Sequence, residues 1–239
     1  MQRIRIRSNT RNSTPLPDDD IYLCSQEDDL KKQIVSYSPN VFTKEECEQI
    51  IALGDTKYKD RWSDARVYNV NSGNRSAPVE EDTRLGETNF FRYFEEPWII
   101  NKLLPVAREY NNRYCRWDID WFGLDHEMQL ARYSNTGDWF EWHQDIDWNI
   151  TEHLESLHEN KYKRKISVII QLTDPKEYDG GRLLVGKELR CESEVDTEAE
   201  YLQQGTVIFF PAWYRHKVTE ISRGTRYSFT IWLLGPPWK

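Results

Sequence analysis

The second half of the chain contains five short runs rich in β-branched, aromatic and other apolar residues. Gly, Pro, Asp and Asn, the usual turn residues, separate these runs. The runs are MQLARYS at 128–134, KISVIIQLT at 165–173, GRLLV at 181–185, GTVIFFP at 205–211 and RYSFTIWLL at 226–234. Several short strands with turn signals between them indicate a β-sandwich or a β-barrel. We therefore expect a β core from about residue 117 onward.

Helical signals gather in the first half of the chain. Thr43 followed by Glu46 is a capping-box pattern, and Phe42 stands where a hydrophobic staple residue precedes the cap. The pattern predicts a helix that begins there and is closed by Gly54. A second helix is predicted from Pro97 to about residue 113, with Pro105 expected to kink or split it. Residues 55–90 are interpreted as loops with one or two short strands, and 151–160 as a small helix interrupting the β region.

These patterns together predict an α+β, mainly β protein with supporting N-terminal helices. Residues 1–33 are interpreted as a flexible or partly ordered arm, and 34–239 as one domain. Within that domain the helical support covers about 40–115 and the β core about 117–235. The chain has 239 residues, of which 13% are aromatic. Disordered chains are poor in such residues, so we expect a core built largely from rings.

Charge and cysteine usage restrict the partners and the compartment. The formal net charge of −8 argues against non-specific binding to nucleic acid or to an anionic membrane. The four cysteines are widely scattered, which fits reduced thiols better than a disulfide framework. No apolar run approaches the roughly 20 residues of a membrane span, and the first residues lack a signal-peptide pattern. A cytoplasmic protein that is a monomer or a weak dimer is the expectation.

One constellation of residues points to metal chemistry. His143 and Asp145 are two residues apart, so on an extended strand their side chains project to the same side. His216 follows the strand-like run GTVIFFPAW, 73 residues downstream, where a neighbouring strand can bring it alongside. Two histidines and one carboxylate on one face of a metal are the ligand set of non-haem Fe(II) oxygenases. Alone, the His-x-Asp pair is a weak signal, since surface residues form the same tripeptide by chance.

Arg226 strengthens the signal. It lies ten residues after His216 and begins an apolar strand-like run. An arginine on the inner face of such a strand is costly unless it meets an anion, and its planar fork suits a carboxylate. The alternative is an arginine that points outward to solvent.

The sequence resembles the Fe(II)/2-oxoglutarate-dependent dioxygenases, in particular the prolyl 4-hydroxylase-like branch. The resemblance covers roughly residues 36–235 and includes FTKEECEQIIALG, MQLARYSNTGDWFEWHQD, ISVIIQLTDPKEYDGGRLLV and GTVIFFPAWYRHKVTEISRGTRYSFTIWLL. It implies a double-stranded β-helix (jelly-roll) core. It also implies Fe(II), 2-oxoglutarate and O₂ as cofactor and cosubstrates, with ascorbate as a reductant.

The resemblance also assigns roles to single residues. It implies that His143, Asp145 and His216 are the iron ligands and that Arg226 binds the distal carboxylate of 2-oxoglutarate. Tyr133 matches a cosubstrate-contacting tyrosine, although a core ring is the alternative. The less specific matches are two cosubstrate-side positions, Gln171 and Trp232, and three substrate-side positions, Trp139, Phe140 and Arg164. Gln171 departs from the family pattern, and Trp232 fits a packing role equally well.

Several functions remain open at this point. The favoured one is hydroxylation of a peptidyl proline, with a peptide or protein as substrate. The alternatives are a hydroxylase of a free amino acid or other small molecule, a nucleic-acid demethylase of the same fold, and a non-catalytic jelly-roll binding module. A demethylase places a second arginine six residues after the first, where this chain has Trp232. An intact Asp145 favours hydroxylation over halogenation.

Overall fold

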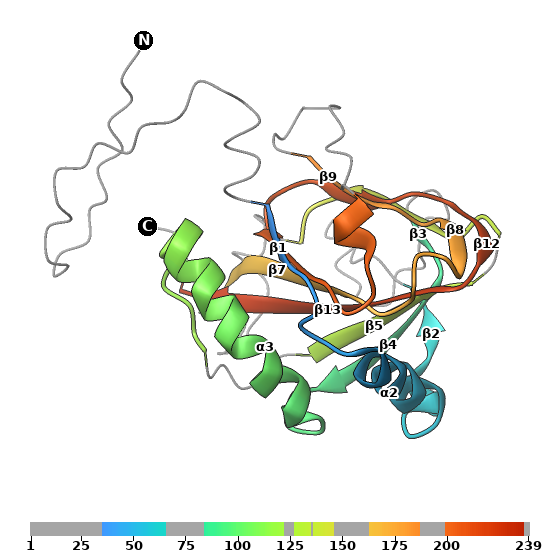
Figure 1. Ribbon diagram of the computed structural model, residues 1–239, viewed down its shortest axis with the longest axis horizontal. Coiled ribbons are helices and arrows are strands. Elements are labelled where there is room, and N and C mark those ends of the chain that lie inside the picture. Colours follow the sequence, from blue (N-terminus) through green and yellow to red (C-terminus); the bar gives the residue numbers. More distant parts are fainter. Residues whose placement is uncertain are drawn as a thin grey trace, which may run out of the picture.

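Two facing antiparallel sheets form the centre of the molecule, and two helices lie outside them (Figure 1). The computed structural model describes residues 35–65, 84–121, 127–134, 136–145, 163–186 and 199–236. The larger sheet has seven strands in the order β1 (Ser36–Ser38), β10 (Val207–Pro211), β7 (Lys163–Gln171), β13 (Arg226–Gly235), β5 (Glu127–Tyr133), β4 (Glu87–Arg92) and β2 (Ser63–Asp64). We call it the major sheet.

The smaller sheet has four strands, in the order β3 (Arg84–Leu85), β6 (Trp139–His143), β11 (His216–Val218) and β9 (Leu183–Val185). We call it the minor sheet. A third pairing joins β8 (Tyr178–Gly180) to β12 (Ile221–Gly224). Buried side chains from both larger sheets form one shared cluster, which includes Tyr133 and Phe210 from the major sheet and Val185 and Val218 from the minor sheet. The two sheets therefore pack face to face.

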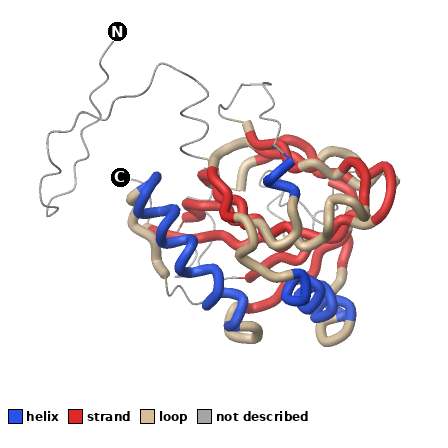
Figure 2. Tube along the Cα trace, viewed as in Figure 1, coloured by secondary structure: helices blue, strands red, loops and turns tan. Residues whose placement is uncertain are grey.

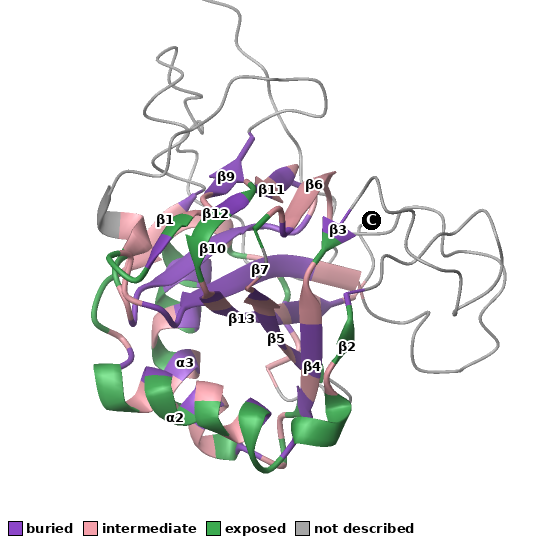
Figure 3. Ribbon diagram, turned by 90° about the vertical axis from the view of Figure 1, so that its right-hand side faces the viewer, coloured by how far each residue is buried: buried purple, intermediate pink, exposed green. Residues whose placement is uncertain are grey.

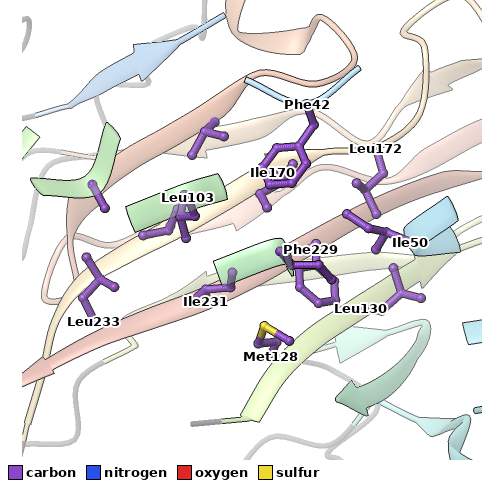
Figure 4. Close-up of a cluster of buried hydrophobic side chains, with 14 of the residues drawn as sticks. Phe42, Ile50, Leu103, Met128, Leu130, Ile170, Leu172, Phe229, Ile231 and Leu233 are labelled. Carbon is purple, nitrogen blue, oxygen red and sulfur yellow. The ribbon is translucent and has the colours of Figure 1, made fainter. Parts of the chain in front are cut away.

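The other face of the major sheet is covered by helices α2 (Lys44–Asp55) and α3 (Pro97–Tyr110), as Figure 2 shows. The cluster between them is almost wholly apolar (Figure 4). It joins residues of the helices, such as Ile50 and Leu103, to residues of the strands, such as Leu130 and Phe229. Figure 3 shows buried strands at the centre and exposed residues along the outer sides of both helices. The mainly β class with supporting N-terminal helices is confirmed.

Helix α2 begins as predicted and ends differently. The Thr43 hydroxyl accepts a hydrogen bond from the Glu46 N–H at 3.3 Å, and the Glu46 carboxylate accepts one from the Thr43 N–H at 2.7 Å. The prediction that Gly54 closes the helix is wrong, because the helix continues to Asp55 and the cap is Thr56. A Cβ at Gly54 would lie 2.5 Å from Leu130 Cδ2. This glycine therefore allows close contact between α2 and β5.

Helix α3 begins at Pro97, a favourable first-turn position, and continues through Pro105. The prediction that Pro105 splits the helix is wrong. Pro105 lies on the exposed side of the helix, and so does Asn101, whose carbonyl loses its intrahelical partner to the proline. One π-helical turn, η3 (Asn111–Cys115), follows α3. Two further short turns are the 3₁₀ helices η1 (Lys59–Arg61) and η4 (Ala199–Leu202).

The five predicted runs all contain strands of the structure, namely β5, β7, β9, β10 and β13. Residues 55–90 contain β2 and β3 and most of β4, which is longer than the short strands expected there. The N-terminal arm 1–33 and the helix at 151–160 lie outside the described residues. Cys47 and Cys115 form no disulfide, while Cys24 and Cys191 lie outside the described part of the chain. Within the described ranges, no helix has the length and apolar character needed to cross a membrane.

Candidate active site

The structure brings His143, Asp145 and His216 together in the space between the sheets. His143 ends β6, Asp145 follows two residues later, and His216 begins β11 as the direct partner of His143. One ligand atom from each residue lies within 4.8 Å of the others. The Nε2 atoms of His143 and His216 lie 3.8 Å and 3.4 Å from the Asp145 carboxylate. The side chains of Asp145 and His216 are only 8% and 5% exposed.

A register shift in the minor sheet orients His143. His216 pairs with His143, but Val218 pairs with Phe140, so β11 advances two residues while β6 advances three. Such a bulge changes which side chains share a face. As a result the rings of Phe140 and His143 stack with their centroids 3.5 Å apart. The ring centroid of His216 lies 4.0 Å from the ring centroid of His143.

Both imidazoles are held in the same tautomer. Nδ1 of His143 lies 2.7 Å from the Glu141 carbonyl oxygen, and Nδ1 of His216 lies 3.0 Å from the Tyr214 carbonyl oxygen. Because a carbonyl oxygen only accepts, each Nδ1 carries a hydrogen, which leaves Nε2 as the nitrogen available to a metal. Burial, reinforced by His216, lowers the pKa of His143 well below its ordinary value. The ring is therefore neutral, as a metal ligand must be.

Asp145 is held through both its backbone and its side chain. Its backbone N–H donates to the Ala212 carbonyl at 2.9 Å, and the Ser167 hydroxyl donates to Oδ2 at 2.5 Å. Burial opposes its ionisation, but nearby positive charge, including that of Arg164, and the Ser167 hydrogen bond outweigh that effect, so the pKa of the Asp145 carboxyl is lowered. The site thus combines two imidazole nitrogens with one carboxylate.

Arg226 lies deep in the same space and lacks a carboxylate partner. It is 1% exposed and begins β13, opposite Tyr133 on β5. Its Nη2 donates to Gln171 Oε1 at 2.9 Å and its Nη1 to Ser228 Oγ at 3.3 Å, while Nε has no partner. Among the described residues, no acidic group forms an ion pair with it. A buried guanidinium that meets only neutral oxygens is well suited to receive an anion.

The Tyr-Asp-Gly-Gly turn supports this arginine. Gly180 and Gly181 both have positive φ, at 78° and 57°. A Cβ on Gly181 would lie 2.4 Å from Ile221 Cδ1 and 3.0 Å from Arg226 Cδ. Both the backbone conformation and the lack of space explain why glycine stands beside Arg226.

The remaining predicted residues lie at different distances from the ligand set. Arg164 lies beside it, since its Nη1 is 3.4 Å from the Asp145 carbonyl and its Cζ is 3.7 Å from the Trp232 ring centroid. The buried Nε1 of Trp232 has no partner in the described part of the chain. Trp139 and Phe140 are partly buried on β6. Of these residues, only Phe140 contacts a ligand ring directly through a stack with His143.

Two polar residues near the ligand set were not predicted from the sequence. Ser167 sits in the middle of an apolar strand, where a serine carries no signal of its own until its partner Asp145 is known. Arg84 lies on β3, in a stretch interpreted mainly as loops. It is 5% exposed, and its Cζ is 4.3 Å from the centroid of the Phe140 ring.

The 2OG-Fe(II) oxygenase superfamily is the family whose sequence model matches this chain, over residues 128–234. That match spans β5 to β13 and contains His143, Asp145, His216 and Arg226. This match supports assignment of the chain to the 2OG-Fe(II) oxygenase superfamily. It equally supports a 2-oxoglutarate-dependent dioxygenase.

A related protein and two solved structures agree with this assignment. A PKHD-type hydroxylase of Acinetobacter baylyi is 22% identical over 84% of this chain and 78% of its own length. A prolyl-4-hydroxylase of Pseudomonas putida superimposes with a TM-score of 0.59 at 17% identity, covering 86% of this chain and 95% of that one. A prolyl hydroxylase of Trichoplax adhaerens, solved with a hypoxia-inducible factor peptide, gives 0.61 at 13% identity, covering 87% and 86%. These structural matches confirm the jelly-roll fold of this oxygenase.

Proposed function

We propose that this oxygenase hydroxylates a peptidyl proline, with His143, Asp145 and His216 as the ligands of Fe(II). The observation that carries the proposal is the orientation of the two imidazoles. Each Nδ1 hydrogen is used on a backbone carbonyl, so both Nε2 atoms are directed toward the buried Asp145 carboxylate. This donor set fits the metal that the family uses. When bound, iron with 2-oxoglutarate and O₂ supplies the oxidation that inserts oxygen into a substrate C–H bond, forming succinate and CO₂.

The chain itself binds and orients the cosubstrate in this proposal. Arg226 grips the distal carboxylate of 2-oxoglutarate with its two Nη atoms, and Gln171 and Ser228 hold the guanidinium in place. Gln171 therefore acts through Arg226, which is a role that the sequence did not specify. Tyr133, 2% exposed, lies across the strand pair from Arg226 with its ring centroid 5.8 Å from the guanidinium carbon. Its hydroxyl is the proposed second cosubstrate contact.

Other side chains exclude water and shape the substrate side. Phe140 covers one face of the His143 ring, and Phe210 lies 4.8 Å from the ring of His216. Arg164 and Trp232 form a stacked pair next to Asp145. We assign Trp139, Phe140 and Arg164 to the substrate side, and Trp232 to the wall of the pocket. Dry, ring-lined surroundings restrict side reactions of a strong oxidant.

A peptide is favoured as the substrate because these two structural neighbours are prolyl hydroxylases, one of them in complex with a peptide fragment. Use of ascorbate as a reductant, a monomeric or weakly dimeric state, residues 34–239 as one domain, no affinity for nucleic acid and a cytoplasmic location stay predictions from the sequence. The alternative substrate is a free amino acid.

The experiment is a panel of proline-containing peptides and free amino acids incubated with the protein, Fe(II), 2-oxoglutarate and O₂. Succinate release coupled to a mass gain of one oxygen on a proline peptide is the expected result. Oxygen added only to free amino acids, or succinate formed without any modified substrate, contradicts the peptidyl-proline proposal. As the control, His143→Ala should abolish the charge-transfer band that Fe(II) and 2-oxoglutarate produce together without O₂.

A further inference from the structure

Arg84 is a second buried guanidinium close to the ligand set, and no role has yet been assigned to it. It is 5% exposed, and its Nε has no hydrogen-bond partner. Its one described hydrogen bond is a long one, from Nη2 to Gln129 Oε1 at 3.4 Å. No acidic residue in the described ranges forms an ion pair with it.

Other arginines of the protein show what is missing at Arg84. Arg132 forms a salt bridge with Glu87, and Arg61 forms a bidentate salt bridge with the Glu95 carboxylate. These two side chains are more exposed than Arg84, at 24% and 41%. A guanidinium that is removed from water without a counter-charge is unfavourable. A counter-anion for Arg84 therefore has to come from outside the described residues.

The position of Arg84 directs that anion toward the reacting centre. Its Cζ lies 4.3 Å from the Phe140 ring centroid, and the Phe140 ring stacks at 3.5 Å on His143. A single aromatic ring thus separates the guanidinium from a proposed iron ligand. A group bound at Arg84 lies next to the substrate side of the site.

Arg84 and Arg226 serve different parts of the pocket. Gln129, the partner of Arg84, and Tyr133, which lies opposite Arg226, are four residues apart on β5. Four residues of a strand span about 13 Å. An extended five-carbon dicarboxylate held at Arg226 is too short to cover that distance. A 2-oxoglutarate held at Arg226 by its distal carboxylate therefore does not place its other carboxylate at Arg84.

We propose that Arg84 and Gln129 form a subsite for a carboxylate of the substrate. The proposal rests on the proposed hydroxylase function and narrows its substrate class. Arg84 offers a planar set of donors to the two carboxylate oxygens, with Nε unengaged and Nη2 only weakly engaged. The substrate is then a peptide with a carboxylate near the hydroxylated residue, either at its C-terminus or on a neighbouring acidic side chain.

The test measures the binding of peptides, without O₂, to the protein loaded with Fe(II) and 2-oxoglutarate. Calorimetry gives the affinity, and the change in the charge-transfer band reports binding near the metal. The probes are matched peptides: one with a free C-terminal proline, its C-terminal amide, and amidated peptides with Asp or Asn next to the proline. A proline-free acid and amide pair completes the set. We expect at least one carboxylate form to bind 10-fold or more tightly than its neutral match. A preference for the free C-terminus over its amide identifies the C-terminal carboxylate as the bound group, and a preference for Asp over Asn identifies an acidic side chain.

Arg84→Gln should remove this preference and leave the affinities for Fe(II) and 2-oxoglutarate unchanged. Arg84→Lys should keep part of it, because the charge remains. Arg92→Gln, which removes an exposed arginine on β4, is the matched control and should keep all of it.

Equal binding of every acid and amide to the wild-type protein, or no binding of any acid, overturns the subsite. A preference that persists in Arg84→Gln, or a loss of 2-oxoglutarate affinity in that variant, also overturns it. If Arg84→Gln does not fold, the wild-type ratio and the Arg84→Lys variant decide in its place. A preference that depends on Arg84 without hydroxylation of any proline peptide refutes the proposed function and leaves the subsite standing.

Discussion

The two faces of the major sheet are built from the same strands and have opposite characters. The outer face, against α2 and α3, carries fully buried apolar residues such as Leu130, Val168 and Phe229. The inner face carries polar or charged groups at many of the alternate positions, namely Gln129, Ser167, Gln171, Arg226, Ser228 and Thr230, beside apolar residues such as Ile169 and Phe210. Alternation of side chains along a strand thus separates packing on one side from chemistry on the other.

Substitution on the outer face should therefore cost stability and spare the site. Phe229→Ala removes a fully buried ring that packs against Phe91 in a tilted arrangement, with the ring centroids 5.4 Å apart. We expect the free energy of unfolding to fall by about 3–5 kcal/mol, as in other Phe-to-Ala core variants. Urea denaturation measures this fall. The affinity of the folded protein for Fe(II) and 2-oxoglutarate should remain that of the wild type; a large loss would break the division between the faces.

Substitution of Arg226, three positions earlier on the same strand, should have the converse effect. Arg226→Gln removes the charged donors proposed to bind 2-oxoglutarate. Hydrogen bonds to charged groups contribute about 1.5–3 kcal/mol, so the affinity should fall about 10- to 150-fold. Calorimetric titration with 2-oxoglutarate measures this loss. Binding of Fe(II) alone serves as the internal control and should not change, whereas an unchanged 2-oxoglutarate affinity contradicts the assigned role.

The faces were predictable to different degrees. Apolar runs with turn residues between them revealed the major sheet, and the His-x-Asp pair with Arg226 revealed the site, because those signals are local in the sequence. Ser167 and Arg84 were missed, because their importance depends on partners distant along the chain. Gly54 and Pro105 were misread for a related reason. The contact of Gly54 with Leu130 and the exposed side of Pro105 are set by tertiary packing, which overrides local helix signals.

Ser167 also lies on the inner face, and its side chain bonds to Asp145, not to a residue proposed to bind 2-oxoglutarate. Ser167→Ala removes the hydroxyl that donates to Asp145 Oδ2 at 2.5 Å. Loss of such a supporting hydrogen bond typically lowers metal affinity about 10- to 100-fold, and we expect the lower end of that range. Competition titration with a metal-binding dye measures it. Ser167→Thr keeps the hydroxyl and should restore most of the affinity; equal losses in both variants would indicate a packing effect.

The smallest effect is expected at the start of α2, on the outside of the molecule. Thr43→Ala removes the side chain that caps the helix. The free energy of unfolding should fall by about 1 kcal/mol, the usual cost of losing such a cap. Thermal unfolding followed by circular dichroism detects this change. Succinate production should stay at the wild-type rate, and a decrease would show that the outer helices influence the chemistry.

The location of the site between the sheets has a consequence for the stability of the whole protein. His143 and His216 belong to the minor sheet, while Arg226 and Gln171 belong to the major sheet. At the proposed site, iron and 2-oxoglutarate bound together would act as a removable cross-link between the two halves of the sandwich. Ligands that bind only the folded state raise its stability by mass action, by about 2.7 kcal/mol at 100 times the dissociation constant. We therefore expect the lifetime of the folded protein to rise with the supply of iron and 2-oxoglutarate.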